Sequence, residues 1–382
     1  MSAGKSIPVP PPNTKNIALG IILCVYILFG LYTHQIFVHT NPDYDFHFYE
    51  TALTKALSGA DPYDLRKIGP AFLYPSPSLF IIEAFDVFSN PTVRFYLFLA
   101  VNLIVLLFMI RQISAHFGYS LRDVWFWFPL TFFFAPVLAC LRAGQINLIT
   151  EFGIVLFFIS VLPWLSALGL VLAIITKVTP VAFLFYSFIR KDVRTILYSL
   201  IILTTVIFAA GLRYGFATYP TFFDVFRDLL KIYGITQNSQ SFTSKVWMVF
   251  QPTFAPPIFH RLFLLYLGIL VLGSGVLAFK TKDTIPLFVV LGLAITVSPN
   301  VMWYHHYVFL LPPLLIWMAW QKLENKLVLW IITGLLIVQI DYYFLTTGLL
   351  IHLFVQLSVL RIVYQQYSKL QMSESLRSIS TV

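Results

Sequence analysis

Residues 16–38 of the chain read NIALGIILCVYILFGLYTHQIFV and contain no Asp, Glu, Lys or Arg. A helix of this length can cross the ~30 Å hydrocarbon core of a bilayer, which requires about 20 consecutive apolar residues. Similar runs recur to the end of the chain, which is 59% apolar and only 11% charged. Soluble globular chains carry about 25% charged residues. The sequence therefore predicts a polytopic membrane protein.

The apolar runs favour helices over strands. Gly and Pro interrupt the runs, and they lack the strict alternation of apolar and polar residues that is typical of a transmembrane barrel. We expect an all-α bundle of about twelve transmembrane helices. The expected spans are 16–38, 72–88, 95–110, 123–141, 146–162, 164–189, 195–213, 257–279, 285–298, 302–320, 327–345 and 349–364.

The net charge of +9 is also typical of nucleic-acid-binding proteins, but Lys and Arg collect here in short loops between the expected spans. This is the positive-inside pattern of membrane proteins, so we expect no nucleic-acid partner. Strict alternation places two cytoplasmic tails, 1–15 and 366–382, on either side of a membrane domain, 16–365. The loop 111–122, with two arginines, falls on the opposite face and disagrees with the rule. The expected location is the plasma or inner membrane.

Two long loops, 39–71 and 214–256, fall on the outer face of this topology. Each contains a stretch with apolar residues at helical spacing: DFHFYETALTKALS from Asp45 and TFFDVFRDLLKIYG from Thr221. Amphipathic helices of this kind lie in the plane of the membrane interface. We therefore expect a site at the outer surface, where a lipid and a water-soluble group can meet.

The first of these loops contains NPDYDFHFYE, residues 41–50, with three carboxylates and a histidine. Asp43 and Asp45 could hold a divalent ion against a diphosphate, one of them could be a base, or both could be solvated. Nucleotide sugars are not normally supplied on the outer face, which disfavours the metal pair. Asp43 fits a solvated loop, whereas Asp45 opens a helix, where it can cap amide groups and face a substrate. No metal or soluble cofactor is expected.

Five motifs in order resemble glycosyltransferase family 87. They are DFHFYETALTKALSGADPYD, FLYPSPSLF, LRAGQINLI, ITKVTPVAFLFY and SPNVMWYHHYVFLLPP, between residues 45 and 313. This family includes polyprenyl-phosphate-mannose-dependent α-mannosyltransferases and has the GT-C membrane fold. Two motifs depart from the family pattern: a Tyr-Pro-Pro is Tyr-Pro-Ser-Pro here, starting at Tyr74, and an Asn-Gln-Ser is Ser-Gln-Ser around Gln240.

The resemblance implies that Asp45, at the head of an Asp-x-x-x-Tyr pattern, is the catalytic base. Inverting transfer from a lipid phosphate needs one general base, which takes the proton of the acceptor hydroxyl. The departing phosphate needs no proton, unlike the leaving alcohol in glycoside hydrolysis, so one carboxylate suffices. Asp61 and Tyr63 belong to an Asp-Pro-Tyr-Asp that is either a simple turn or an acceptor contact. Further substrate contacts are expected from Tyr49, Tyr74, Gln145 and Gln240.

Cationic and hydrogen-bonding groups are expected at the leaving phosphate. His305 and His306 lie at the outer end of a span in the family's Trp-x-His-His pattern. Adjacent helical residues point about 100° apart, so we expect at most one to face the site; an interfacial aromatic belt is the alternative. Lys177 lies in mid-segment, where a charge normally faces a cavity or a partner. It either contacts the phosphate or pairs with Glu151.

Gln145 belongs to a family motif, but strict alternation of the spans places it on the cytoplasmic side, away from the expected reaction. Either one of the segments between 146 and 189 is broken or re-entrant, or Gln145 is structural. Asn147 and Glu151 share a helix face at i, i+4 spacing, which favours hydrogen bonds between helices.

The predicted function is transfer of a sugar, mannose by resemblance, from a polyprenyl-phosphate donor to an extracytoplasmic glycolipid or glycan acceptor. A furanosyl (arabinose-type) transferase of the same fold is one alternative. A lipid or sugar transporter or flippase is another, because transporters carry ionisable groups near the midplane, a pattern that Lys177, Glu151 and Asp341 partly fit. The carboxylates in an outer loop and the dissimilar halves of the chain favour the enzyme.

Overall fold

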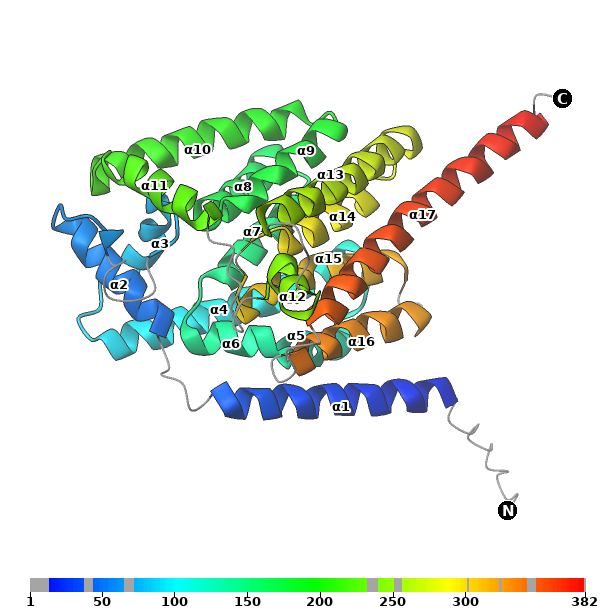
Figure 1. The fold of residues 1–382 in the computed structure, drawn as a ribbon, viewed down its shortest axis with the longest axis horizontal. Helices are drawn as coiled ribbons and strands as arrows, with labels where there is room; N and C mark the ends of the chain where they lie inside the picture. The colour runs from blue at the N-terminus through cyan, green and yellow to red at the C-terminus, as the bar shows by residue number, and fades with distance from the viewer. Residues whose placement is uncertain are drawn as a thin grey trace, which may run out of the picture.

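The structure is a computed structural model that describes residues 14–37, 44–64, 72–231, 240–250, 256–300, 302–322, 325–341 and 348–380. In these ranges every regular element is a helix (Figure 1). The prediction of an all-α chain is confirmed.

Four helices of the described ranges are long and apolar enough to cross a membrane. They are α4 (Pro91–His116), α10 (Val193–Tyr214), α13 (Pro256–Thr281) and, over residues 349–375, α17 (Gly348–Ser380). A fifth span results if α6 (Ala135–Ala143) and α7 (Asn147–Ile159), which meet at a bend of 120°, are one broken segment. The count of about twelve spans stays a prediction.

The remaining elements are shorter or less apolar. They are α1 (Thr14–Phe37), α2 (Tyr44–Leu57), η2 (Ser76–Ser78), α3 (Leu79–Glu83), α5 (Leu121–Phe132), α8 (Pro163–Thr176), η3 (Thr179–Ala182), α9 (Phe183–Ile189), α11 (Thr218–Lys231), α12 (Phe242–Phe250), α14 (Ile285–Val297), η4 (Tyr304–Leu310), α15 (Leu311–Trp320) and α16 (Asn325–Asp341). The η elements are 3₁₀ helices. Several of the others are apolar helices of 10–17 residues, shorter than a straight span.

The predicted span 72–88 is wrong. Its helical part consists of η2, with three residues, and α3, with five, about 12 Å of chain against a ~30 Å core. Its carboxylates form ion pairs: Glu83 with Arg213, and Asp86 with Arg94. Proline and paired charges therefore turn an apolar run into a short cap of the bundle.

Helices α4 and α10 each run from one end of the bundle to the other. At one end, Arg94 near the start of α4 pairs with Glu50 of α2. At the other, the last residue of α4, His116, lines a cavity together with Arg190 and Lys282. We name this the basic cavity. Helix α10 runs back: its capping residue Asp192 lines the same cavity, and its last residue, Tyr214, donates a hydrogen bond to Glu83 next to α2.

This course places the end of α4 at the same end of the bundle as the loops that contain Arg190 and Lys282. The disagreement between loop 111–122 and the positive-inside rule followed from the wrong span at 72–88. Helices α2, α3 and α11 gather at one side of the bundle, whereas α1 begins and α17 ends at the opposite side (Figure 1).

The main core is built around α14 and α15, whose side chains are almost all buried. A second cluster packs α2 with residues 72–74, α3, the start of α4, the end of α10 and α11. Helices α7 and α8 approach closely because glycines face each other: a Cβ on Gly153 would lie 2.6 Å from the carbonyl oxygen of Gly169. Both amphipathic helices predicted in the long loops form, as α2 and α11.

We expect the α2 end to face outward, because the basic loops lie at the other end. In a Cys24→Ser background, which removes the exposed native thiol, a cysteine placed at exposed Ser58, directly after α2, should react with an impermeant thiol reagent on intact cells. One placed at exposed Ser373 of α17 should react only after permeabilisation. The reverse pattern would place α2 in the cytoplasm.

Candidate active site

Asp45 lies in the first turn of α2 and is half-buried. The side-chain nitrogen of Gln145, a hundred residues later, donates a hydrogen bond to its Oδ2 atom. Burial raises the pKa of Asp45 from 3.8 to about 6, although the hydrogen bond from Gln145 acts in the opposite direction. A carboxyl group with a pKa close to neutral is suited to general base catalysis.

Two tyrosines fix the orientation of the Gln145 amide. The Tyr74 hydroxyl donates to Gln145 Oε1 at 2.9 Å, and the Tyr49 hydroxyl lies 3.2 Å from the same oxygen and 3.0 Å from Tyr74 Oη. Since the amide oxygen accepts from phenols, the amide nitrogen must face Asp45. Burial raises the pKa of both tyrosines well above the usual value, so both remain protonated donors.

The bend between α6 and α7 brings Gln145 to α2. Gly144 ends α6 in the left-handed conformation, with φ of 68°, which glycine adopts without steric cost. A Cβ at this position would lie 2.6 Å from the Cβ of Phe46. Glycine is thus required by the backbone and by the contact with α2. This bend lies just before the segments in which a break was expected. A break within them also occurs, since α8 ends at Thr176 and η3 begins at Thr179. The role of Gln145 in the reaction stays a prediction.

Lys177 lies directly after α8, in extended backbone at φ −152° and ψ 133°. Its ammonium group donates to Asn147 Oδ1 at 3.3 Å and lies 4.4 Å from the ring centroid of Phe309. It also interacts electrostatically with Glu151, which is 1% exposed. The lysine therefore faces the bundle interior. From this position it can pair with Glu151 and also contact a ligand in the site.

The two histidines lie on η4, with ring centroids 4.6 Å apart. The Nδ1 atom of His306 accepts a hydrogen bond from the Trp303 backbone at 3.3 Å, and the His305 ring stacks on Trp303. Lys177 interacts electrostatically with both rings. With Nδ1 as acceptor, a neutral His306 carries its proton on Nε2, which is then a hydrogen-bond donor.

The α6–α7 corner joins these groups into one centre. Gln145 contacts Asp45 on one side, and Asn147, two residues later, contacts Lys177 on the other. Asn147 also donates to Cys140 Sγ at 3.7 Å, and that thiol lies 3.5 Å from the carbonyl oxygen of His305. A carboxylate and a cation are thus positioned by two amides on a single turn.

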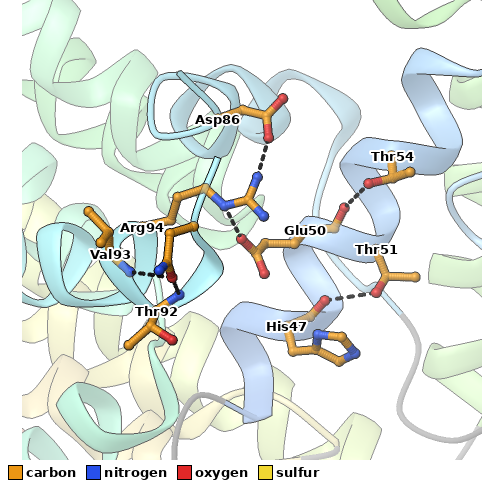
Figure 2. A network of polar contacts seen from close by, with 9 residues as sticks. His47, Glu50, Thr51, Thr54, Asp86, Thr92, Val93 and Arg94 are labelled. Atoms are coloured by element: carbon orange, nitrogen blue, oxygen red, sulfur yellow. Dashed lines mark hydrogen bonds and ion pairs between the residues drawn. The ribbon is translucent and has the colours of Figure 1, made fainter. Parts of the chain in front are cut away.

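A network of charges holds α2 against α4 (Figure 2). Arg94 Nε lies 2.7 Å from Glu50 Oε1, and the same guanidinium pairs with Asp86. Both side chains of the Arg94–Glu50 pair are less than one-fifth exposed. Sequence analysis did not identify this network, because it joins residues 44 positions apart and no motif marks the pairing.

The other predicted site residues lie further from this centre. Asp61 is exposed, and its Oδ1 accepts the Tyr63 backbone N–H at 2.9 Å, which makes a turn. Tyr63 is buried and donates to the Tyr74 backbone oxygen at 2.9 Å, so it supports the loop that carries Tyr74. Gln240 is buried behind η4, where its carbonyl oxygen accepts from Tyr307. Asp43 lies outside the described residues.

Comparison with known proteins gives one match. The model of glycosyltransferase family 87 matches residues 72–299. This range includes Tyr74, Gln145, Asn147 and Lys177. The comparison with curated proteins finds no match, and the comparison with solved structures finds none either.

Catalysis by an ionised Asp45 should depend on pH. With a pKa of about 6, kcat/KM should rise tenfold per pH unit below this value and level off above it. Gln145→Leu removes the hydrogen bond that lowers the pKa, so its midpoint should move to higher pH. Gln321→Leu, at the end of α15, is the matched control with an unchanged midpoint. A wild-type midpoint near 4, or no shift in Gln145→Leu, would contradict this assignment.

The Arg94–Glu50 pair should act as one unit. Arg94→Gln and Glu50→Gln should each lower activity about tenfold, because either one breaks the ion pair that joins α2 to α4 and so loosens α2. The double variant should be no worse than the single ones. Lys55→Gln, also on α2, breaks a 3.9 Å pair with Asp64, which lies beyond the end of the helix; it should change activity less than twofold. Additive losses of about a hundredfold would exclude coupling.

Proposed function

Because the chain belongs to glycosyltransferase family 87, we propose that it moves a sugar from a polyprenyl-phosphate donor to an acceptor hydroxyl outside the cytoplasm. That it is a membrane glycosyltransferase follows from the family match and from the apolar helices. The observation that carries the finer proposal is the α6–α7 corner. It places a carboxylate and a cation on the two sides of one turn.

The proposed reaction is a single displacement. Asp45 takes the proton of the acceptor hydroxyl while the acceptor oxygen bonds to the anomeric carbon. The bond from that carbon to the phosphate oxygen breaks, its electron pair stays on the phosphate, and the configuration inverts. Gln145 holds Oδ2 of Asp45, so Oδ1 is the atom assigned to the acceptor proton.

The leaving phosphate gains negative charge that the site must stabilise. Lys177 supplies a cation, and η4 supplies an imidazole N–H donor from His306. Preorganised donors and cations in a water-excluded site are strong stabilisers of developing charge. With this charge met by side chains and no proton needed by the phosphate, we propose that neither a metal nor a second carboxylate takes part.

The sugar and the acceptor are proposals of the same kind. Mannose is the sugar by resemblance to the family, and a furanose such as arabinose is the second candidate. A glycolipid or glycan acceptor fits a site on α2, an amphipathic helix of the kind that lies at the membrane surface. The proposed location is the plasma or inner membrane, with the site on its outer face.

A donor panel tests the proposal. Purified protein is incubated with membrane lipid extract and with polyprenyl-phosphate mannose, glucose or arabinofuranose, and products are identified by mass spectrometry. Transfer from one lipid-phosphate sugar, with mannose expected, supports the proposal. Transfer from a nucleotide sugar with no lipid phosphate present would refute it.

The base assignment predicts a graded set of variants. Asp45→Asn keeps the size of the side chain but cannot accept the proton, so kcat should fall by about 10²–10⁴-fold. Asp43→Asn should cost less than tenfold, and Asp61→Asn should at most raise the KM for the acceptor. Asp64→Asn, on the exposed surface beside α2, is the matched control. An inactive Asp43→Asn beside an active Asp45→Asn would show that the wrong aspartate is assigned.

A further inference from the structure

The basic cavity has a volume of about 560 Å³ and lies at the end of the bundle away from Asp45. The ends of α4, α7, α9 and α13 border it, as do the starts of α8, α10 and α14. Because α4 and α10 each extend from α2 and α3 to this cavity, the site and the cavity are separated by the length of a membrane-crossing helix. The cavity is therefore not part of the transfer site.

Cations dominate the lining. Arg190, Lys191 and Lys282 line the cavity, and Asp192 is the one carboxylate among its described lining residues. Asp192 is engaged as the cap of α10: it accepts the Thr195 N–H at 3.1 Å and the Thr195 hydroxyl at 2.7 Å. The cavity therefore has an excess of positive charge that an anion would neutralise.

Two of the cations lie near the same aromatic ring. The Lys282 ammonium lies 4.5 Å from the ring centroid of Phe279, and that of Lys191 lies 5.3 Å from the same ring. The Arg190 guanidinium lies 5.3 Å from the ring of Tyr186, another lining residue. Like charges gathered at one ring repel each other, so a bound anion would stabilise this arrangement.

The backbone conformation at Lys191 and Lys282 is unusual for lysine. Lys191 and Lys282 each follow a helix end in the left-handed conformation, with φ of 58° and 62°, where glycine is the usual residue. Lys322 has the same conformation, with φ of 57°, but does not line the cavity. A lysine is thus tolerated at such a helix end, and the backbone alone does not identify a site. Lys322 does provide a matched control.

The surroundings indicate what kind of anion fits. Phe158, Ile159 and Ile285 form apolar walls beside the cations. At the mouth, Val161 is 91% exposed, and Phe188 on the neighbouring α9 is 68% exposed, as expected of surface covered by acyl chains. A ligand that combines a phosphate with an apolar tail matches both parts.

We propose that the basic cavity binds the headgroup of an anionic phospholipid from the membrane leaflet at this end of the bundle. The phosphate lies between Lys191 and Lys282, and Arg190 offers a planar pair of donors to it. The acyl chains run along the exposed apolar surface of α8 and α9. Basic pockets between membrane helices on the cytoplasmic side bind headgroups of this kind.

The test is native mass spectrometry on the purified full-length chain in detergent, with phosphatidylglycerol or phosphatidylcholine added. Wild-type protein should retain one phosphatidylglycerol in preference to phosphatidylcholine. Each lysine near an anionic headgroup contributes about a fivefold change in affinity, so Lys191→Asn with Lys282→Asn should weaken this binding about 25-fold. Asparagine tolerates the left-handed backbone. Lys322→Asn should bind as wild type does.

A folding defect is excluded by a second pair of variants, Lys191→Gly and Lys282→Gly, which relaxes the backbone and removes the same charges. It should lose the lipid while keeping the thermal stability of the wild type. The proposal is overturned if the paired variants retain phosphatidylglycerol, or if Lys322→Asn loses it equally. It is also overturned if millimolar inorganic phosphate displaces the lipid, since the cavity would then be a site for free phosphate.

Discussion

The turn between α6 and α7 is the feature on which the rest of the site depends. A left-handed Gly144 bends the chain by 120°, and the two amides that follow point to opposite partners. Gln145 holds the carboxylate of Asp45, and Asn147 holds the ammonium of Lys177. In the proposed reaction, both charges depend on these amides for their positions. The turn also packs directly against α2, because Phe46 leaves no space for a side chain at Gly144.

The position of α2 is the second constraint. The proposed role of Asp45 requires α2 to keep one angle and one position against the bundle. Aromatic packing of Phe46 on Phe95 and Phe98 supplies a non-directional contact, with ring centroids 5.8 Å and 5.0 Å apart. The ion pair of Arg94 with Glu50 adds direction, because a guanidinium pairs with a carboxylate in a preferred geometry. An amphipathic helix of the kind found at membrane surfaces is thus held by a membrane-crossing one.

The sequence predicted the helical class, both loop helices and the motif residues that meet at Asp45. The prediction was wrong where it rested on hydropathy alone. Residues 72–88 are apolar enough to count as a span, but prolines and paired carboxylates make them a short cap. Without that span, and with the break after α8, the alternation places loop 111–122 with the other basic loops and Gln145 on the same side as Asp45, where the structure has it. Periodicity does not reveal a 120° bend, although Gly144 between two apolar helices was a usable signal. The Arg94 network arises from tertiary pairing, which a single sequence does not encode in any local pattern.

In the proposed reaction, one carboxylate, Asp45, receives the proton while Lys177 and η4 stabilise the phosphate. The most direct measurement is an experimental structure of the protein with a phosphonate analogue of the lipid-phosphate sugar and with acceptor bound. We expect the acceptor hydroxyl about 2.6–3.2 Å from Asp45 Oδ1, the range required of a general base. We also expect the phosphonate beside Lys177. An acceptor hydroxyl held by another carboxylate, or a phosphonate away from Lys177, would show that the proposed roles of Asp45 and Lys177 are wrong.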